Sequence, residues 1–429
     1  MKNLVLCFYA ICLFSCFTSS QQPITLFPGN SPRLLQGFSS LPNQFQVNTY
    51  QVEEQYFPRI AILSDGKFVI VWMSYLQDGS ELGIYAQIYK ADGTPYSPEF
   101  QVNTNFERSQ MNPSITALTN GGFIIVWESV NALGSSLLCA QKYDLNGQRI
   151  GGEFLVSTPS DHQINPSVAP LQNDGFIVIW VQVQSTNTRI AGKMFDTAGG
   201  SMNFIITAPG EVVGGPTVKA FADGSFIVAW SVERNSYDIV ARVFDPSGLI
   251  PTPEFEINEF NPDFDETPTV TILSDDSFVV AWTATDIDGD RKGVIARKFA
   301  KNGTPIGDQF IVNTNRNGDQ RNQAITSFSD GSFLVIWESV NIVTGSYELF
   351  GQRFDINGNP IELETSLGIS SESSFDHDIA AFENGDFLLA WSTSDIVGQY
   401  DVDAKIYCGA LTVPTATRCL SILLIYLNT

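Results

Sequence analysis

The densest group of side chains that could bind a metal ion is an alternating run of carboxylates. Asp286, Asp288 and Asp290 stand two residues apart, and hard carboxylate oxygens are the ligands that calcium prefers. The run lacks the glutamate that usually closes a calcium-binding loop, and Gly289 falls one position too early for such a loop. The pattern therefore predicts either a Ca²⁺ site or an ordinary polar turn, and the fold is expected to require no cofactor.

Other acidic residues gather in segments that connect apolar runs. Glu53 and Glu54 form one group, and Asp263, Asp265 and Glu266 form another. Variable loops on a rigid scaffold are where binding residues are expected. We therefore predict that these carboxylates belong to a ligand-binding face.

Catalysis needs a positioned acid, base or nucleophile, and the chain offers few candidates. Its two histidines, His162 and His377, are expected in equivalent loops of two distant repeats, so they form no pair. Glu128 and Glu338 each follow a tryptophan, and we interpret them as polar residues at the start of a loop. The sequence thus identifies no catalytic residue.

All of these candidates must be positioned by a repeat. The chain of 429 residues holds seven tryptophans, one in each repeat of 50 to 55 residues, and a phenylalanine precedes each by four positions. Self-similarity at this period indicates one supersecondary unit copied many times. The tryptophans are Trp72, Trp127, Trp180, Trp230, Trp282, Trp337 and Trp391.

Each repeat contains four short β-rich runs, which in the first repeat are 58–64, 68–72, 84–89 and 100–104. The second run is apolar throughout, which indicates a sheet covered on both faces. We therefore predict an all-β fold, a seven-bladed β-propeller with four-stranded blades. The chain enters with a lone run of the fourth type, so residues 45–49 should complete the last blade of a ring that spans 45–408.

Two repeated motifs carry a resemblance to a known family. Residues 330–337 read Asp-Gly-Ser-Phe-Leu-Val-Ile-Trp and residues 310–314 read Phe-Ile-Val-Asn-Thr. Such repeats resemble those of large secreted, adhesin-like proteins of bacteria and protists, a poorly characterised β-propeller-like family. The resemblance covers Phe45 to Tyr407 and implies an extracellular setting, but no activity.

The ends of the chain carry processing signals. Residues 1–20 have the charge, apolar core and small residues of a secretory signal peptide, and 21–44 form a lead into the ring. The tail 409–429 resembles a GPI-anchor signal, and Cys408 and Cys419 could instead form a disulfide that holds it. Asn302 begins the sequon Asn-Gly-Thr and is the expected glycosylation site.

The net charge of −23 disfavours nucleic acid as a partner. The sequence predicts a secreted or cell-surface monomer that binds an extracellular protein or glycan without catalysis and meets a membrane only through a GPI anchor. The alternative is a carbohydrate-active propeller, a hydrolase or lyase with Ca²⁺ in its funnel.

Overall fold

The computed structural model describes residues 39–40, 44–157, 162–184, 187–208, 212–233, 237–259, 265–371, 373, 376–394 and 400–409. The expected signal peptide, Asp263 and the tail beyond Gly409 therefore lie outside the described residues. For Asp265 and Glu266 only the backbone is described.

The described chain folds into seven antiparallel sheets, which confirms the predicted seven-bladed β-propeller. Along the chain, each of the first six blades takes four consecutive strands. Blade 1 contains β3 (Gln55–Ile62), β4 (Phe68–Tyr75), β5 (Leu82–Tyr89) and β6 (Phe100–Gln101); blade 2 contains β7 (Gln110–Ala117), β8 (Phe123–Val130), β9 (Ser136–Tyr143) and β10 (Arg149–Leu155); blade 3 contains β11 (His162–Pro170), β12 (Phe176–Gln184), β13 (Asn187–Phe195) and β14 (Ser201–Ile205).

The same order continues through the second half of the ring. Blade 4 contains β15 (Val212–Ala220), β16 (Phe226–Glu233), β17 (Tyr237–Phe244) and β18 (Phe255–Glu256); blade 5 contains β19 (Asp265–Ile272), β20 (Phe278–Thr285), β21 (Lys292–Phe299) and β22 (Phe310–Ile311); blade 6 contains β23 (Gln320–Ser327), β24 (Phe333–Val340), β25 (Tyr347–Phe354) and β26 (Thr365–Ser371). Blade 7 contains β27 (Asp376–Ala381), β28 (Phe387–Ser394) and β29 (Tyr400–Cys408), together with β1 (Ser39–Ser40) and β2 (Phe45–Gln46).

The first and last described segments of the ring meet in blade 7, as predicted. Phe45 of β2 pairs with Ala404 of β29, in the register that outer strands keep in the other blades. Strand β2 is shorter than the expected run 45–49. Strand β1 also pairs with β29, although β1 lies in the segment 21–44 that was expected to be a lead into the ring. Closure in this way removes the open edges of the first and last sheets.

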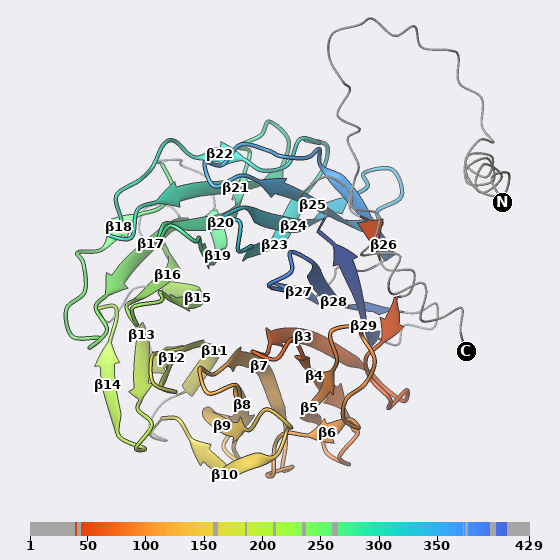
Figure 1. The fold of residues 1–429 in the computed structure, drawn as a ribbon, viewed down its shortest axis with the longest axis vertical. Helices are drawn as coiled ribbons and strands as arrows, with labels where there is room; N and C mark the ends of the chain where they lie inside the picture. Colours follow the sequence, from red (N-terminus) through yellow and green to blue (C-terminus); the bar gives the residue numbers. More distant parts are fainter. Residues whose placement is uncertain are drawn as a thin grey trace, which may run out of the picture. The chain divides into compact units, whose positions relative to one another are not determined.

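The first strand of every blade is innermost. These seven strands contact one another in sequence around the axis of the ring, and the last, β27, contacts β3 (Figure 1). Among the described residues, no helix long and apolar enough to cross a membrane is present.

Stacked aromatic rings fill each blade and meet the next one. In all seven blades the phenylalanine that opens the second strand stacks on the aromatic residue that closes the third, with ring centroids 4.5 to 5.3 Å apart. A phenylalanine from the preceding outer strand then covers the stack, as Phe100 covers Tyr143 at 5.4 Å. Blade 6 departs from this plan, because Thr365 opens its outer strand and Tyr407 instead donates a hydrogen bond to the Leu367 carbonyl.

The covering phenylalanine also explains a small residue that recurs in every third strand. Phe204 lies directly opposite Gly192, and a Cβ on this glycine would lie 2.6 Å from the Phe204 ring. The close contact at Gly192 therefore lies within one sheet and not between neighbouring sheets.

The Asn of the Phe-x-Val-Asn-Thr motif joins adjacent blades. The Asn103 side chain accepts a hydrogen bond from the Ile84 amide in its own blade and donates to Gln110 of the next blade, at 2.8 and 3.0 Å. Asn48 with Gln55 and Asn313 with Gln320 repeat this arrangement. The motif is therefore a structural joint.

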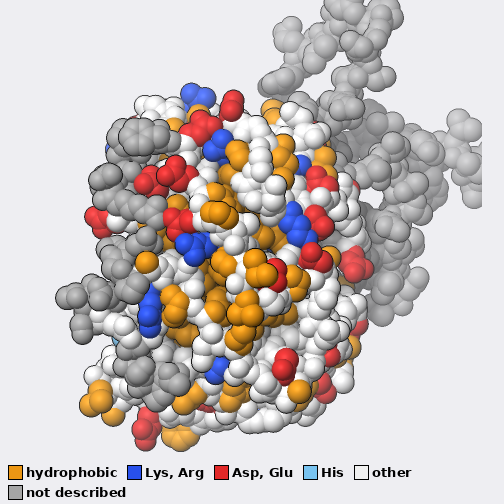
Figure 2. Space-filling view, turned by 90° about the vertical axis from the view of Figure 1, so that its left-hand side faces the viewer, with side chains coloured by type: hydrophobic (Ala, Val, Ile, Leu, Met, Phe, Trp, Pro, Cys, Tyr) orange, Lys and Arg blue, Asp and Glu red, His pale blue; other side chains and the backbone are white. Residues whose placement is uncertain are grey.

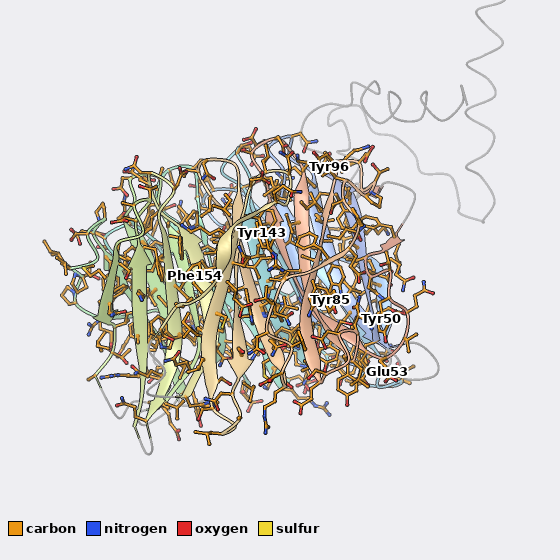
Figure 3. All side chains as sticks on the ribbon, turned by 90° about the horizontal axis from the view of Figure 1, so that it is seen from below. Tyr50, Glu53, Tyr85, Tyr96, Tyr143 and Phe154 are labelled. Atoms are coloured by element: carbon orange, nitrogen blue, oxygen red, sulfur yellow. The ribbon has the colours of Figure 1, made fainter. Side chains whose placement is uncertain are left out.

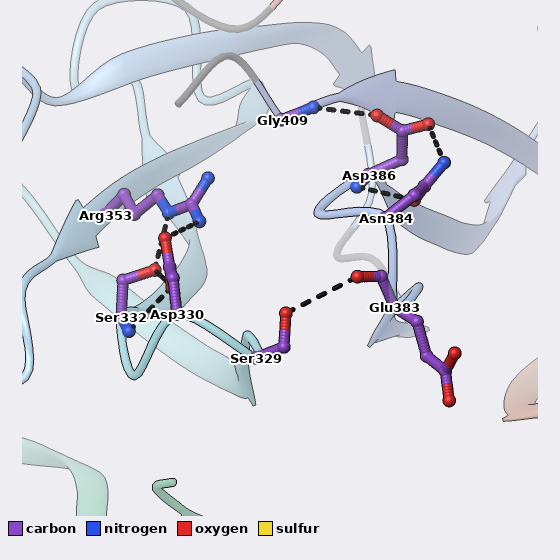
Figure 4. Close-up of polar contacts among 8 residues, drawn as sticks. All are labelled: Ser329, Asp330, Ser332, Arg353, Glu383, Asn384, Asp386 and Gly409. Atoms are coloured by element: carbon purple, nitrogen blue, oxygen red, sulfur yellow. Dashed lines mark hydrogen bonds and ion pairs between the residues drawn. The ribbon is translucent and has the colours of Figure 1, made fainter. Parts of the chain in front are cut away.

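The tight turns of the first hairpins are joined in a similar way. In Figure 4 the Ser329 hydroxyl donates to the Glu383 carbonyl of the next blade, and Arg353, which is buried, bridges Asp330 and Ser332 within its own blade. Gly331 takes a φ of 85°, a conformation that favours glycine. These hydrogen-bonded turns line one face of the ring.

The outer rim leaves some apolar side chains in water. Figure 2 views the rim on the side of β13, β14 and β18 and shows hydrophobic side chains mixed with charged ones. Ile205, Leu249 and Ile250 are exposed on β14 and in the connection after β17. Several outer strands are only two residues long, which limits the backbone available for pairing with another chain.

Truncation of a repeat tryptophan should strongly destabilise the ring. Trp127 is fully buried and packs against Val69 and Val71 of the preceding blade. We expect Trp127→Ala to lower the free energy of unfolding by about 3–5 kcal/mol, measured by urea denaturation. Leu249→Ala is the control and should have almost no effect, so equal losses would contradict this packing.

The ring closure should become less stable as pH rises. Burial and the nearby charge of Asp401 raise the pKa of Asp403, the residue that pairs with Gln46, to about 6, although a hydrogen bond from Gln44 opposes the shift. Because the protonated form is favoured in the folded state, the stability that this carboxyl contributes at low pH is lost between about pH 4 and pH 6.

Asp403→Asn should therefore raise the free energy of unfolding at about pH 8 by up to about 3 kcal/mol and change it little at about pH 4. Denaturant unfolding of both proteins at the two pH values measures the difference. An effect of the same size at both would contradict the assignment.

Candidate functional site

The two faces of the ring differ in their connections. The connections from the fourth strand of one blade to the first strand of the next lie on the same side of the ring as the connections from the second to the third strand within a blade. We call this side the long-loop face; the tight turns between first and second strands lie on the opposite side. Figure 3 shows Tyr50 and Glu53, which precede β3, at one face and Tyr96, which follows β5, at the opposite face. The first residues of β3 and β27 consequently lie toward the long-loop face.

The predicted ligand face is only partly described. Glu53 is exposed and adopts a φ of 62°, and the Glu54 carbonyl accepts a hydrogen bond from the Tyr75 amide. Asp263 lies outside the described residues, whereas Asp265 and Glu266 open strand β19 and do not lie in the connecting segment where they were expected. The proposal that these five residues bind a ligand stays a prediction.

The predicted calcium ligands do not converge. Asp288 is buried, and its Oδ2 accepts a hydrogen bond from the Asn313 joint at 2.8 Å. Asp290 instead accepts from the Gly318 amide at 2.9 Å. In the described part of the chain, no group of three or more His, Cys, Asp or Glu side chains is arranged to hold a metal ion. The geometry thus gives the calcium prediction no support.

The predicted glycosylation site and the predicted disulfide are only partly described. Asn302 is exposed in the turn between β21 and β22, and its side chain accepts a hydrogen bond from the Thr304 amide. Cys408 ends β29, but Cys419 lies outside the described residues. Glycosylation and the disulfide therefore remain predictions.

The interpretation of Glu128 and Glu338 as loop-entry residues is wrong. Both lie inside second strands, β8 and β24, and are 1% and 0% exposed. Glu128 Oε1 accepts hydrogen bonds from the Asn112 side chain and from the Asn165 amide of the next blade, at 2.8 and 2.7 Å. Burial raises the pKa of Glu128 and these hydrogen bonds oppose the shift. Glu128, on β8, therefore links the first strand of its own blade, β7, to the first strand of the next blade, β11.

Those first strands share a local distortion that blade 7 lacks. In blades 1 to 6 a β-bulge interrupts the pairing of the first and second strands, and the bulge holds a residue with positive φ, such as Asn112 or Asn165. The next residue is proline in five of them, and proline cannot donate to the ladder. Blade 7 has His377 there, and β27 pairs without interruption from Asp376 to Ala381.

Blade 7 therefore presents acidic residues where the other blades are bulged. Asp376 takes the position of the bulged residue, and Asp378 stands where blades 2 to 6 have Ser, Thr or Ala. Residues two apart on a regular strand point to the same side, with Cα atoms roughly 6–7 Å apart. The two carboxyl groups thus form a pair on the innermost strand of the closing blade.

The flanking blades add charged partners to this pair. In blade 6, Arg321 lies opposite Glu338 and its Nε is 3.4 Å from Glu338 Oε2. In blade 1, Arg59 occupies the position equivalent to Asp378, and its charge acts on both aspartates. We call Arg59, Arg321, Glu338, Asp376 and Asp378 the axial cluster.

The pKa of both aspartates is raised, but the groups that surround them differ. Burial raises the pKa of Asp376, the charge on Glu338 adds to this effect, and Arg59 opposes it. Burial also raises the pKa of Asp378, but Arg59, Lys219 and hydrogen bonds from two backbone amides favour its charged form. One of these amides, that of Ile60 at 2.8 Å, belongs to blade 1. Two carboxyl groups in unlike environments are the usual basis for separate acid and base roles.

The histidines do not join the axial cluster as a pair. His162 opens β11, and its Nδ1 accepts a hydrogen bond from the Ser136 amide at 2.9 Å. His377 lies within β27. The expectation that both stand in equivalent loops is wrong, because each is part of a first strand and they occupy different positions in it.

The comparisons with known proteins agree on the fold. No protein-family model and no curated protein matches the chain. Its structure is similar to that of a protein of unknown function from Dyadobacter fermentans, at 8% identity and a TM-score of 0.55 over 85% of this chain and 98% of that one.

Two polysaccharide lyases are similar in the same way. Uly1 is 9% identical with a TM-score of 0.53, over 90% of this chain and 94% of that one. A PL25 ulvan lyase bound to -[GlcA(1-4)Rha3S]- is 9% identical with a TM-score of 0.55, over 85% and 93%. At these identities the similarity shows the propeller fold alone.

The calcium hypothesis can be tested without knowledge of the function. If Asp286, Asp288 and Asp290 bind Ca²⁺, millimolar calcium should raise the melting temperature, because a ligand of the folded state stabilises it. Asp290→Asn should abolish this rise. An unchanged melting temperature of the unmodified protein would contradict the hypothesis.

Proposed function

We propose that the protein is a polysaccharide-cleaving enzyme of the hydrolase type, with its active site at the axial cluster. One observation carries the proposal: on the first strands of blades 7 and 1 the repeat breaks its own pattern, with Asp376 at the bulge position and Asp378 and Arg59 where blades 2 to 6 have Ser, Thr or Ala. Arg321 and Glu338 of blade 6 complete the cluster. The two polysaccharide lyases with the same fold support an action on carbohydrate over the adhesion predicted from sequence.

The chemistry assigned to the cluster is general acid–base catalysis. Asp376, whose pKa is raised, donates its proton to the oxygen of the glycosidic bond as that bond breaks. Asp378 accepts a proton from the water that attacks the sugar carbon, so water is added across the bond. Glu338 is fully buried and acts through its charge on Asp376.

A hydrolase fits this cluster better than a lyase. A lyase removes a proton next to a uronic acid carboxylate and leaves a double bond in the product. Tyr56 is the tyrosine coupled to Asp376, but burial and the surrounding negative groups raise its pKa, which makes it a poor base. Two carboxyl groups on one strand instead supply the acid and base that hydrolysis requires.

The test is an assay of polysaccharide cleavage. The protein should release reducing ends without the ultraviolet absorbance of an unsaturated product. Asp376→Asn should lower kcat about 100- to 10,000-fold, the range of a lost general acid, and wild-type activity should fall as pH rises through the pKa of Asp376.

Asp308→Asn is the matched control, because Asp308 is exposed in the connection between β21 and β22; it should leave activity unchanged. Cleavage that survives Asp376→Asn would contradict the assignment. Binding of a polysaccharide with no cleavage by the wild-type protein would instead favour the non-catalytic binding function predicted from sequence.

A further inference from the structure

Tyrosine side chains border the axial cluster on the long-loop face. Tyr347 is the first residue of β25 in blade 6, and Tyr400 is the first residue of β29 in blade 7. Tyr56 lies in β3 of blade 1, directly after Gln55. All three are half-buried, so each packs in part on the ring and leaves part of its surface open to a ligand.

Contacts between side chains connect these rings to the axial cluster in a definite order. The Arg321 guanidinium lies 5.2 Å from the centroid of the Tyr347 ring and reaches Glu338 with its Nε. On the other side, the Tyr56 and Tyr400 rings meet edge to face at 6.4 Å. Tyr56 is also electrostatically coupled to Asp376. The order from blade 6 to blade 1 is therefore Tyr347, the carboxyl groups of the axial cluster, and then the Tyr56–Tyr400 pair. We call this series of side chains the arc.

This order matches the chemistry of a sugar chain. A pyranose ring has apolar C–H faces and a polar edge of hydroxyl groups, so it binds best where aromatic rings stand beside a few well-placed polar groups. Aromatic rings on both sides of the carboxyl pair provide for sugar rings on both sides of one glycosidic bond. A site of this length fits a polysaccharide better than a single sugar.

Charge decides which polysaccharide the arc suits. The whole chain carries a net charge of −23. At the axial cluster the Arg321 guanidinium is paired with Glu338, and the charges of Arg59 and Lys219 act on the aspartates. These cations already interact with carboxyl groups of the protein, so a uronic acid or a sulfate ester would have to displace one of them while being repelled by the negative protein as a whole. A neutral chain meets neither obstacle.

We propose that Tyr347 on one side and the Tyr56–Tyr400 pair on the other bind consecutive sugar rings of a neutral polysaccharide, with the bond between them at Asp376. This inference rests on the proposed function for the location of the bond. The binding of sugar rings by the tyrosines can be tested separately from cleavage.

The experiment measures binding by affinity gel electrophoresis in hydroxyethylcellulose, arabinan and ulvan. The Asp376→Asn protein serves as the parent, because it should bind without turnover. It should be retarded by at least one neutral polymer and about tenfold less by anionic ulvan. Adding Tyr347→Ala or Tyr400→Ala should weaken binding about tenfold each, whereas Tyr347→Phe should retain it, since the ring remains.

Tyr237→Ala is the matched control. Tyr237 opens β17 of blade 4 at the same repeat position as Tyr347 and Tyr400, and its loss should not change binding. Melting temperatures of all variants identify any that fail to fold, and for those the corresponding Tyr→Leu variant, which fills the space without an aromatic ring, is measured instead.

The outcomes separate the two proposals. Tyrosine-dependent binding in a protein whose wild type cleaves nothing would support the arc and reject the proposed function. Asp376-dependent cleavage with binding that is unchanged by Tyr347→Ala and Tyr400→Ala would overturn the arc and leave the proposed function standing. Preferred binding of ulvan would overturn the neutral substrate class.

Discussion

Each sheet of this ring has two apolar faces, and neither can be left in water. The second strands are buried along nearly their whole length, and each repeat tryptophan packs against the preceding blade. A blade is therefore stable only between two neighbours, and the first and last blades must meet. Closure through β2 and β29 satisfies this constraint, and the aromatic stacks and Asn joints fix the spacing around the ring.

The sequence predicted the scaffold well because the scaffold is what repeats. Seven copies of Phe and Trp at a fixed offset reveal which residues are buried, and the lone run near Phe45 reveals how the ring closes. The exact partners could not be read in this way. That the motif Asn reaches Gln110 of the next blade, or that Phe204 lies over Gly192, depends on three-dimensional register.

The candidate site could not be predicted from the sequence in this way, because most of its residues do not repeat. Its residues carry no motif, because most of them are departures from the repeat. Glu338 follows a tryptophan as Glu128 does in blade 2, whereas Asp376 and Asp378 stand where blades 2 to 6 have a bulge and Ser, Thr or Ala. An alignment of the seven repeats would have exposed these departures, but only the ring brings blades 6, 7 and 1 together.

The central claim is that sugar is bound and cleaved at the innermost strands of the closing blade. Its most direct test is a crystal structure of the Asp376→Asn protein with a neutral oligosaccharide. The account predicts sugar rings beside Tyr347 and Tyr400 and a glycosidic oxygen within hydrogen-bonding distance of residue 376. Sugar bound at blades 2 to 5 or on the outer rim, with the axial cluster empty, would contradict it.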